Sequence, residues 1–172
     1  MESLDWESIY LLPRICTLRT KLRNFQFKFL HRRTATNSFL FKIQFSKSNL
    51  CRFCQTVQET LLHLFWECSI TEAFWNSVQQ FFISVDLIPA SQVLNFCQCL
   101  GLKGEKSTLL FNHCFLLGRF YIYSCKCKNV RPSSIEYVNQ VRCNLKVEKH
   151  ASIITGTQNA FQQKWHKILQ SL

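Results

Sequence analysis

The spacing of apolar residues along the chain predicts a mostly helical protein. Between residues 17 and 33, apolar side chains recur every three or four positions, which is typical of one helix face: Leu18, Leu22, Phe25 and Phe29. Similar patterns predict further helices over 37–45, 60–68, 70–83, 106–128 and 160–172. Another helix is predicted from about Pro132 onward, with an apolar face formed by Ile135, Val138, Val141 and Leu145. A short apolar segment over 6–12 should end at Pro13, and 91–100 fits a short helix or a strand.

Polar residues and glycines mark where these helices should begin and end. Thr36 or Asn37 can cap the helix over 37–45, and Ser69 or Thr71 can cap the helix that follows the cysteine-rich segment. Thr155-Gly156-Thr157 indicates a turn between the last two helices. With only four glycines and three prolines in 172 residues, an all-β fold with many tight turns is disfavoured.

The charge of the chain is strongly positive and unevenly distributed. Twenty-one Lys and Arg residues face ten Asp and Glu residues, giving a formal net charge of +11, which indicates a polyanionic partner. Residues 1–50 carry a net +6, residues 51–100 a net −3 and residues 101–172 a net +8. The run from Arg14 to Lys47 contains nine bases and no acid. The flanks, rather than the middle, should therefore contact the polyanion.

Aromatic residues lie between these bases, as expected of a surface that binds nucleic acid. Phe25 and Phe29 belong to the apolar helix face and should be buried, whereas Phe27 lies opposite them and is the better candidate for stacking on a base. The candidate nucleic-acid-binding residues are Arg19, Lys21, Arg23, Lys28, Arg32, Arg33 and Lys42. We expect RNA or DNA to be bound with low sequence specificity.

Composition disfavours several other classes of protein. The chain has two aspartates, Asp5 and Asp86, which leaves little material for a two-metal nuclease or polymerase site. Its acidic first residues do not resemble a secretory signal, and no apolar run is long enough to span a membrane. We therefore expect an intracellular protein, in the nucleus or the cytoplasm, whose ten cysteines are core residues or metal ligands.

Four residues in the middle of the chain have the spacing of a zinc site: Cys51-x2-Cys54-x8-His63-x4-Cys68. The two-residue gap places the first two thiols on one turn, and the histidine and last cysteine span one helical turn. Four such ligands saturate tetrahedral zinc, so the ion would be structural and would not activate water. The alternative is that these cysteines are ordinary core residues.

The other cysteines have weaker patterns. Cys97-x-Cys99 and Cys125-x-Cys127 have spacings poorly suited to chelation by one element. Core burial is the default interpretation, with a second zinc that also uses His113 and Cys114 as the alternative. Nothing in the sequence marks one thiol as an activated nucleophile.

The motifs around the cysteines resemble a known family. Trp6-x2-Ile9-Tyr10-x-Leu12-Pro13, Phe25-Gln26-x-Lys28-x-Leu30-His31-Arg32, Thr36-Asn37-x2-Leu40-x-Lys42, Cys51-x-Phe53-Cys54 and Glu59-Thr60-x2-His63-Leu64-Phe65-x2-Cys68, followed by Trp75, are similar to the zinc-binding (CCHC) domain of LINE-type, non-LTR retrotransposon reverse transcriptases. Gly118-x2-Tyr121-Ile122, Cys125-x-Cys127, Pro132 and Phe161-x3-Trp165 resemble the helical region that ends such proteins.

This resemblance implies a domain over 1–90 that binds one zinc through Cys51, Cys54, His63 and Cys68, and a helical region over 91–172. It also implies binding of template RNA or target DNA beside a polymerase domain. The chain has no paired aspartates and no room for a polymerase or an endonuclease, so we expect a fragment without catalytic activity. The alternative is a helical protein-interaction or structural remnant, with apolar positions on helices 70–83 and 106–128 exposed by the loss of a polymerase interface.

Overall fold

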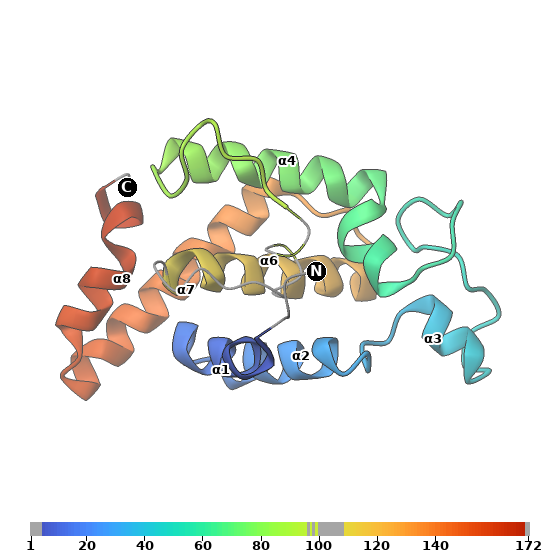
Figure 1. Ribbon diagram of the computed structural model, residues 1–172, viewed down its shortest axis with the longest axis horizontal. Coiled ribbons are helices and arrows are strands. Elements are labelled where there is room, and N and C mark those ends of the chain that lie inside the picture. Colours follow the sequence, from blue (N-terminus) through green and yellow to red (C-terminus); the bar gives the residue numbers. More distant parts are fainter. Residues whose placement is uncertain (1–4, 96, 98, 100–108, 171–172) are drawn as a thin grey trace.

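The protein consists of helices joined by turns and loops in the residues that the computed structural model describes, which are 5–95, 97, 99 and 109–170 (Figure 1). The elements in chain order are α1 (Trp6–Cys16), α2 (Thr20–Leu30), α3 (Asn37–Lys42), the π-helix η1 (His63–Glu67), α4 (Ser69–Ser84), α6 (Leu109–Lys128), α7 (Ser134–Thr155) and α8 (Gln158–Gln170). Within these residues there is no strand, only an isolated antiparallel bridge between Leu50 and Gln58. The predicted mostly-α fold is confirmed.

Helix α6 forms the centre of the molecule, with α1 and α2 on one side and α4 on the other (Figure 1). Fourteen of its twenty residues are buried, so it has no solvent-facing stripe. Gly118 allows the closest approach, because a Cβ atom built there would lie 2.7 Å from Cη2 of the Trp75 side chain on α4. Trp75 is held in place by its indole N–H, which donates to the Phe65 carbonyl at 2.8 Å.

One hydrophobic core joins the two halves of the chain. Phe25 and Phe65 from the first half and Phe115 and Ile122 from the second belong to the same buried cluster. Phe29 and Phe65 meet edge to face with ring centroids 5.0 Å apart, a favoured arrangement for aromatic pairs. The expected exposure of apolar positions over 106–128 is therefore wrong for most of α6, whose apolar residues pack inside this chain. It is also wrong for 70–83, where no large apolar residue is exposed. The boundary near residue 90 stays a prediction.

Several predicted element boundaries and faces differ from the structure. Pro13 does not end the first segment, because α1 continues through it to Cys16; the proline removes one backbone donor without stopping the last turn. Helix α2 begins at Thr20, and this leaves Leu18 61% exposed instead of on the buried face. Ile135 was also expected on a buried face but is 75% exposed, since α7 turns Tyr137 and Val141 inward.

The helix caps are partly as expected. Thr36 is the cap of α3, with its hydroxyl accepting from the Phe39 N–H at 3.3 Å, but that helix ends at Lys42 rather than residue 45. Neither Ser69 nor Thr71 caps α4, and the Thr71 hydroxyl instead donates to the Leu64 carbonyl at 2.8 Å. Gly156 ends α7 in the left-handed conformation (φ +69°), which confirms the predicted turn.

Three predicted segments lie partly outside the described residues: part of 91–100, 106–108 at the start of the helix predicted over 106–128, and 171–172 at the end of the helix predicted over 160–172. No helix in the described part of the chain is long and apolar enough to cross a membrane.

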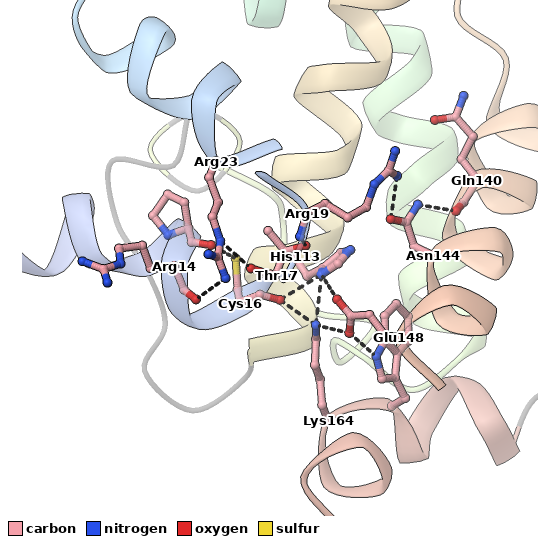
Figure 2. Close-up of polar contacts among 12 residues, drawn as sticks. Arg14, Cys16, Thr17, Arg19, Arg23, His113, Gln140, Asn144, Glu148 and Lys164 are labelled. Atoms are coloured by element: carbon pink, nitrogen blue, oxygen red, sulfur yellow. Dashed lines mark hydrogen bonds and ion pairs between the residues drawn. The ribbon is translucent and has the colours of Figure 1, made fainter. Parts of the chain in front are cut away.

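A buried polar cluster joins α1, α6, α7 and α8 at the end of the molecule away from the cysteine-rich segment (Figures 1 and 2). The Lys164 ammonium donates to the Glu148 carboxylate at 2.6 Å and to the Cys16 carbonyl at 2.5 Å, and it lies 3.0 Å from Nδ1 of His113. The Trp165 indole N–H donates to the same carboxylate at 2.8 Å. Two buried polar atoms of this cluster have no hydrogen-bond partner among the described residues, His113 Nε2 and Glu148 Oε1, and the latter lies 3.4 Å from His113 Nδ1.

Candidate functional site

The four residues with zinc-ligand spacing lie together in the structure. The Sγ atoms of Cys51, Cys54 and Cys68 and a ring nitrogen of His63 all lie within 4.8 Å of one another, which places this set to hold a metal ion. Cys51, His63 and Cys68 are buried and Cys54 is partly buried. In the described part of the chain, no other group of three or more Cys, His, Asp and Glu side chains is placed to do so.

The first two cysteines are presented by a tight turn. The Cys51 N–H donates to the Val57 carbonyl at 2.7 Å, closing the loop that contains both thiols. The Gln55 N–H donates to the Cys51 carbonyl at 2.9 Å, and Gln55 adopts a positive φ of 58°, which lets the chain reverse. The Phe53 N–H points at Cys51 Sγ from 3.4 Å, as a donor toward a thiolate would. Backbone geometry therefore prepares this turn for a negatively charged sulfur.

The other two residues are aligned by a π-helix rather than the α-helix predicted over 60–68. In an α-helix, residues five apart project about 140° from one another, so His63 and Cys68 would point in different directions. In η1 the Cys68 N–H donates to the His63 carbonyl at 2.9 Å, an i to i+5 bond that closes one wide turn. This extra residue per turn brings both side chains to the same side of the segment.

The spacing of the ligand atoms fits tetrahedral zinc. Ideal tetrahedral coordination with Zn–S and Zn–N bonds of about 2.3 and 2.05 Å places two sulfurs about 3.8 Å apart and a sulfur and a nitrogen about 3.6 Å apart. The Cys51 and Cys68 sulfurs are 3.9 Å apart, and Cys54 Sγ is 3.3 Å from His63 Nε2. Three thiols and an imidazole are also the donor set that structural zinc prefers.

The surroundings favour the thiolate form of two of the three cysteines, Cys54 and Cys68. Burial raises the pKa of Cys54, but hydrogen bonds from Thr56, Val57 and His63 outweigh burial and lower it to about 7. The hydrogen bond between the thiols of Cys51 and Cys68 lowers the pKa of Cys68 and raises that of Cys51. Because a thiolate is the form of cysteine that ligates metal, the site is prepared for a cation.

A buried ion pair connects the cysteine-rich segment to α6, and the sequence did not single it out as a site. Glu59 is fully buried, and its carboxylate accepts from the backbone N–H groups of Asn37 and Arg52, each at 2.7 Å. Its Oε1 lies 3.4 Å from Nζ of Lys126, which also donates to the Ala35 carbonyl at 2.5 Å. A glutamate after two cysteines does not match a zinc-ligand pattern. Its role in connecting the cysteine-rich segment to α6 is therefore evident only from its burial and contacts in the structure.

The structure divides the candidate nucleic-acid-binding residues into two groups. Arg19 donates to the Asn144 side chain at 2.8 Å, and Arg23 donates to the carbonyls of Thr17 and Arg14 at 2.8 and 3.1 Å (Figure 2). These two arginines join chain segments. The remaining candidates are exposed: Lys21, whose ammonium lies 5.5 Å from the centre of the Phe120 ring, and Lys28, Arg32, Arg33 and Lys42.

The predicted division of the phenylalanines is confirmed. Phe25 and Phe29 are buried, whereas Phe27 is 58% exposed. Whether Phe27 stacks on a base stays a prediction.

The cysteines outside the cluster form no second metal site among the described residues, and the default interpretation as core residues fits several of them. Cys99, Cys114 and Cys125 are buried, whereas Cys127 and Cys143 are exposed. Burial raises the pKa of Cys16 to about 11 and that of Cys114 to about 12, so both thiols are protonated at neutral pH. His113 Nδ1 lies 2.9 Å from the Cys16 carbonyl, not against a thiol.

Comparison with protein families assigns the segment that contains this site. Residues 6–75 match the family described as zinc-binding in reverse transcriptase, so this part of the chain is a reverse-transcriptase zinc-binding domain. The match confirms the family resemblance and is consistent with a LINE-type origin; the likeness of the tail stays a prediction. The domain is a zinc-binding module rather than a catalytic one, and with the Cys3His cluster it makes zinc the cofactor of this chain. No curated protein and no solved structure matches the chain.

Proposed function

We propose that this protein is a noncatalytic, zinc-stabilised module that binds RNA or DNA with low sequence specificity. The observation that carries the proposal is a set of exposed bases in the first third of the chain: Lys28, Arg32, Arg33 and Lys42. None of them forms an ion pair with an acid in the described part of the chain, and they lie in the acid-free run from Arg14 to Lys47. We name them the basic group.

Exposed Lys and Arg side chains that form no ion pair are suited to binding phosphates. A Lys or Arg that already pairs with a carboxylate must break that pair before it contacts a phosphate, whereas the basic group pays no such cost. Each phosphate contact releases a condensed counterion, which makes affinity fall with salt. Phosphate contacts do not read sequence, hence the proposed low specificity.

The zinc site supports this function by positioning residues rather than by contacting the ligand. We call the segment from Cys51 to Cys68 the finger. Residues 51–100 carry a net charge of −3, and three thiolates around Zn²⁺ add about −1, so the finger would repel a phosphate backbone. Glu59 connects the finger to the first residue of α3 through the Asn37 N–H, and α3 carries Lys42. Zinc would thereby keep Lys42 in place relative to the bases that follow α2.

The proposal extends to the setting in which the module acts. A reverse-transcriptase polymerase domain is the protein partner that the family match makes most reasonable, and the nucleus or cytoplasm is where RNA or DNA would be met. The alternative of a protein-interaction remnant loses both of its supports, since most apolar residues of α6 are buried inside this chain and no large apolar residue over 70–83 is exposed. If the protein bound no nucleic acid, we would conclude that it is such a remnant.

The test measures affinity for RNA and DNA oligonucleotides at several salt concentrations. Replacing all four residues of the basic group with alanine should weaken binding about equally for every sequence. It should also flatten the slope of log affinity against log salt by about 0.7 per lost phosphate contact for a single strand and about 0.9 for a duplex.

The matched control removes the same charge elsewhere. Arg131, Arg142, Lys146 and Lys149 are exposed, and replacing these four with alanine changes the net charge by the same amount. If both quadruple variants lose affinity equally, the total charge rather than the basic group determines binding. If the unaltered protein binds neither RNA nor DNA at low salt, the proposed function is wrong.

A further inference from the structure

Four exposed ring side chains form a continuous row over α1, α2 and the residue that follows α2. Trp6 and Tyr10 lie one turn apart on α1, with ring centroids 6.2 Å apart. Tyr10 is 5.6 Å from the ring of His31, which follows α2, and His31 is 4.3 Å from the ring of Phe27. We call these four residues the aromatic row.

The rings of this row contribute little to the hydrophobic core. Trp6 is 50% exposed, Tyr10 39% and Phe27 58%, and His31 is also exposed. Their neighbours Phe25 and Phe29 on α2 are buried, so the helix has a filled core face and separately presents rings to solvent. A contiguous group of exposed rings is uncommon on a monomeric protein and marks a binding surface.

Two hollows adjoin the row, and each combines its rings with bases. A hollow of about 660 Å³ is lined by Trp6, Arg32 and Lys42, and a second of about 300 Å³ is lined by Tyr10, Phe27 and Arg14. Leu30 lines both, so the hollows are adjacent. Neither hollow has an acid among its lining residues. Rings that can stack and cations that can meet phosphates therefore line the same pair of adjacent hollows.

We propose that the aromatic row is a stacking track for unpaired bases, and that the preferred ligand is consequently single-stranded RNA or DNA. This inference rests on the proposed function and narrows its ligand. A ring face stacks on any nucleobase, but in a duplex both faces of each base are already covered by neighbouring pairs. A surface that bound only phosphates would need the Lys and Arg side chains but not the aromatic rings. The aromatic row is therefore what distinguishes a protein that binds single strands.

The first experiment uses the unaltered protein and three ligands of equal length. These are a single-stranded RNA oligonucleotide, the corresponding duplex, and an abasic single strand that keeps the sugar-phosphate backbone. We expect the single strand to bind at least about tenfold more tightly than the other two, since each stacked base contributes substantially to affinity. The same comparison with DNA shows whether the sugar matters.

The second experiment removes two rings of the row and uses two exposed rings outside it as the control. Tyr10→Ala with Phe27→Ala should weaken single-strand binding by about tenfold or more, with little change for the abasic strand. Phe41→Ala with Phe45→Ala should change neither, although those rings are 47% and 80% exposed. Zinc content and circular dichroism verify that each variant is folded.

The outcomes separate this inference from the proposed function. Equal affinity for all three ligands overturns the stacking track and leaves a phosphate-binding module. Unaltered single-strand affinity in the row variant also overturns it. If none of the three ligands binds, both the proposed function and the stacking track are overturned. The ligand comparison needs no variant, so a row variant that failed to fold would not remove the test.

Discussion

The cysteine-rich finger and the helical centre of this protein are held together by different means. Between Leu30 and His63, the only buried hydrophobic residue of the core is Cys51, a candidate zinc ligand. By contrast, α6 alone buries fourteen residues, including Phe111, Phe115 and Ile122. Apolar burial can therefore stabilise the centre, whereas the finger enters the core mainly through Leu64 and Phe65, which lie between its last two zinc ligands. Its fold must depend on zinc and on a few hydrogen bonds.

The two regions of this chain therefore have separate requirements for folding: metal for the finger and apolar packing for the helical centre. The finger should lose its structure when metal is removed, and the centre should keep most of its helix. The largest expected effect is on the metal itself. Replacing Cys68 with serine should reduce the zinc content from about one ion per chain to near zero, because serine is a poor ligand for zinc.

The structural consequence of the Cys68→Ser change should stay within the finger. We expect faster protease cleavage and hydrogen exchange over 37–62, with little change over 109–128, since the helical centre buries its own core. The exposed Cys143→Ser is the control and should retain zinc. Global loss of circular dichroism in the Cys68 variant would show that the centre also depends on the metal.

The opposite test disturbs the centre and leaves the finger alone. In Gly118→Val the first added carbon would lie 2.7 Å from the Trp75 ring, a side chain that is buried and hydrogen-bonded. Overfilling of this kind should lower the free energy of unfolding by about 3 kcal/mol in chemical denaturation. Ala73→Val at an exposed position of α4 should have little effect. An unchanged midpoint for the Gly118 variant would contradict the close contact between the two helices.

Acid should weaken the centre through His113. Burial lowers the pKa of this histidine to about 4, and the Lys164 and Arg19 charges act in the same direction while Glu148 opposes them. The unfolded chain binds a proton near pH 6.5, so this contribution to stability is complete above that pH and declines as the pH falls toward 4. Between pH 6.5 and 5 it should remove about 2 kcal/mol.

The measurement compares unfolding of the unaltered protein and of His113→Asn across this pH range. Protonation of the zinc ligands affects both proteins equally, so the difference between their slopes reports His113. The exposed His150→Asn is the control and should keep the slope of the unaltered protein. Parallel curves for all three proteins would contradict a buried neutral histidine.

The smallest effect concerns the contact between the two regions. Glu59→Gln removes the carboxylate charge that faces Lys126 and weakens the bonds from Asn37 and Arg52. Because these bonds fix the loop that presents Cys51, zinc affinity should fall by about tenfold in a competition with a chelator. Gln58→Glu, at an exposed neighbouring position, serves as a control for a charge change in the same loop. Equal affinities would mean that the finger binds zinc without its connection to α6.

Sequence patterns predicted the helical elements and the ligand set better than the tertiary roles of polar residues. The apolar period located α2 and α8 because each has one apolar face, but Ile135 was misplaced since α7 buries polar side chains such as Asn144 and Glu148. Arg19 and Arg23 counted as surface bases, and only the fold shows that their partners lie on α7 and α1. Spacing predicted His63 and Cys68 as ligands, yet not the π-helix that aligns them.

That π-helix also determines how the length of this segment can vary. Removing one residue between His63 and Cys68 would leave them four apart, a spacing that an ordinary α-helix already places on one face. Adding one would leave them six apart, about 120° from each other on an α-helix. Natural variants with a one-residue deletion here should therefore keep their zinc, and variants with a one-residue insertion should lose it. The segment should therefore tolerate the loss of one residue but not the addition of one.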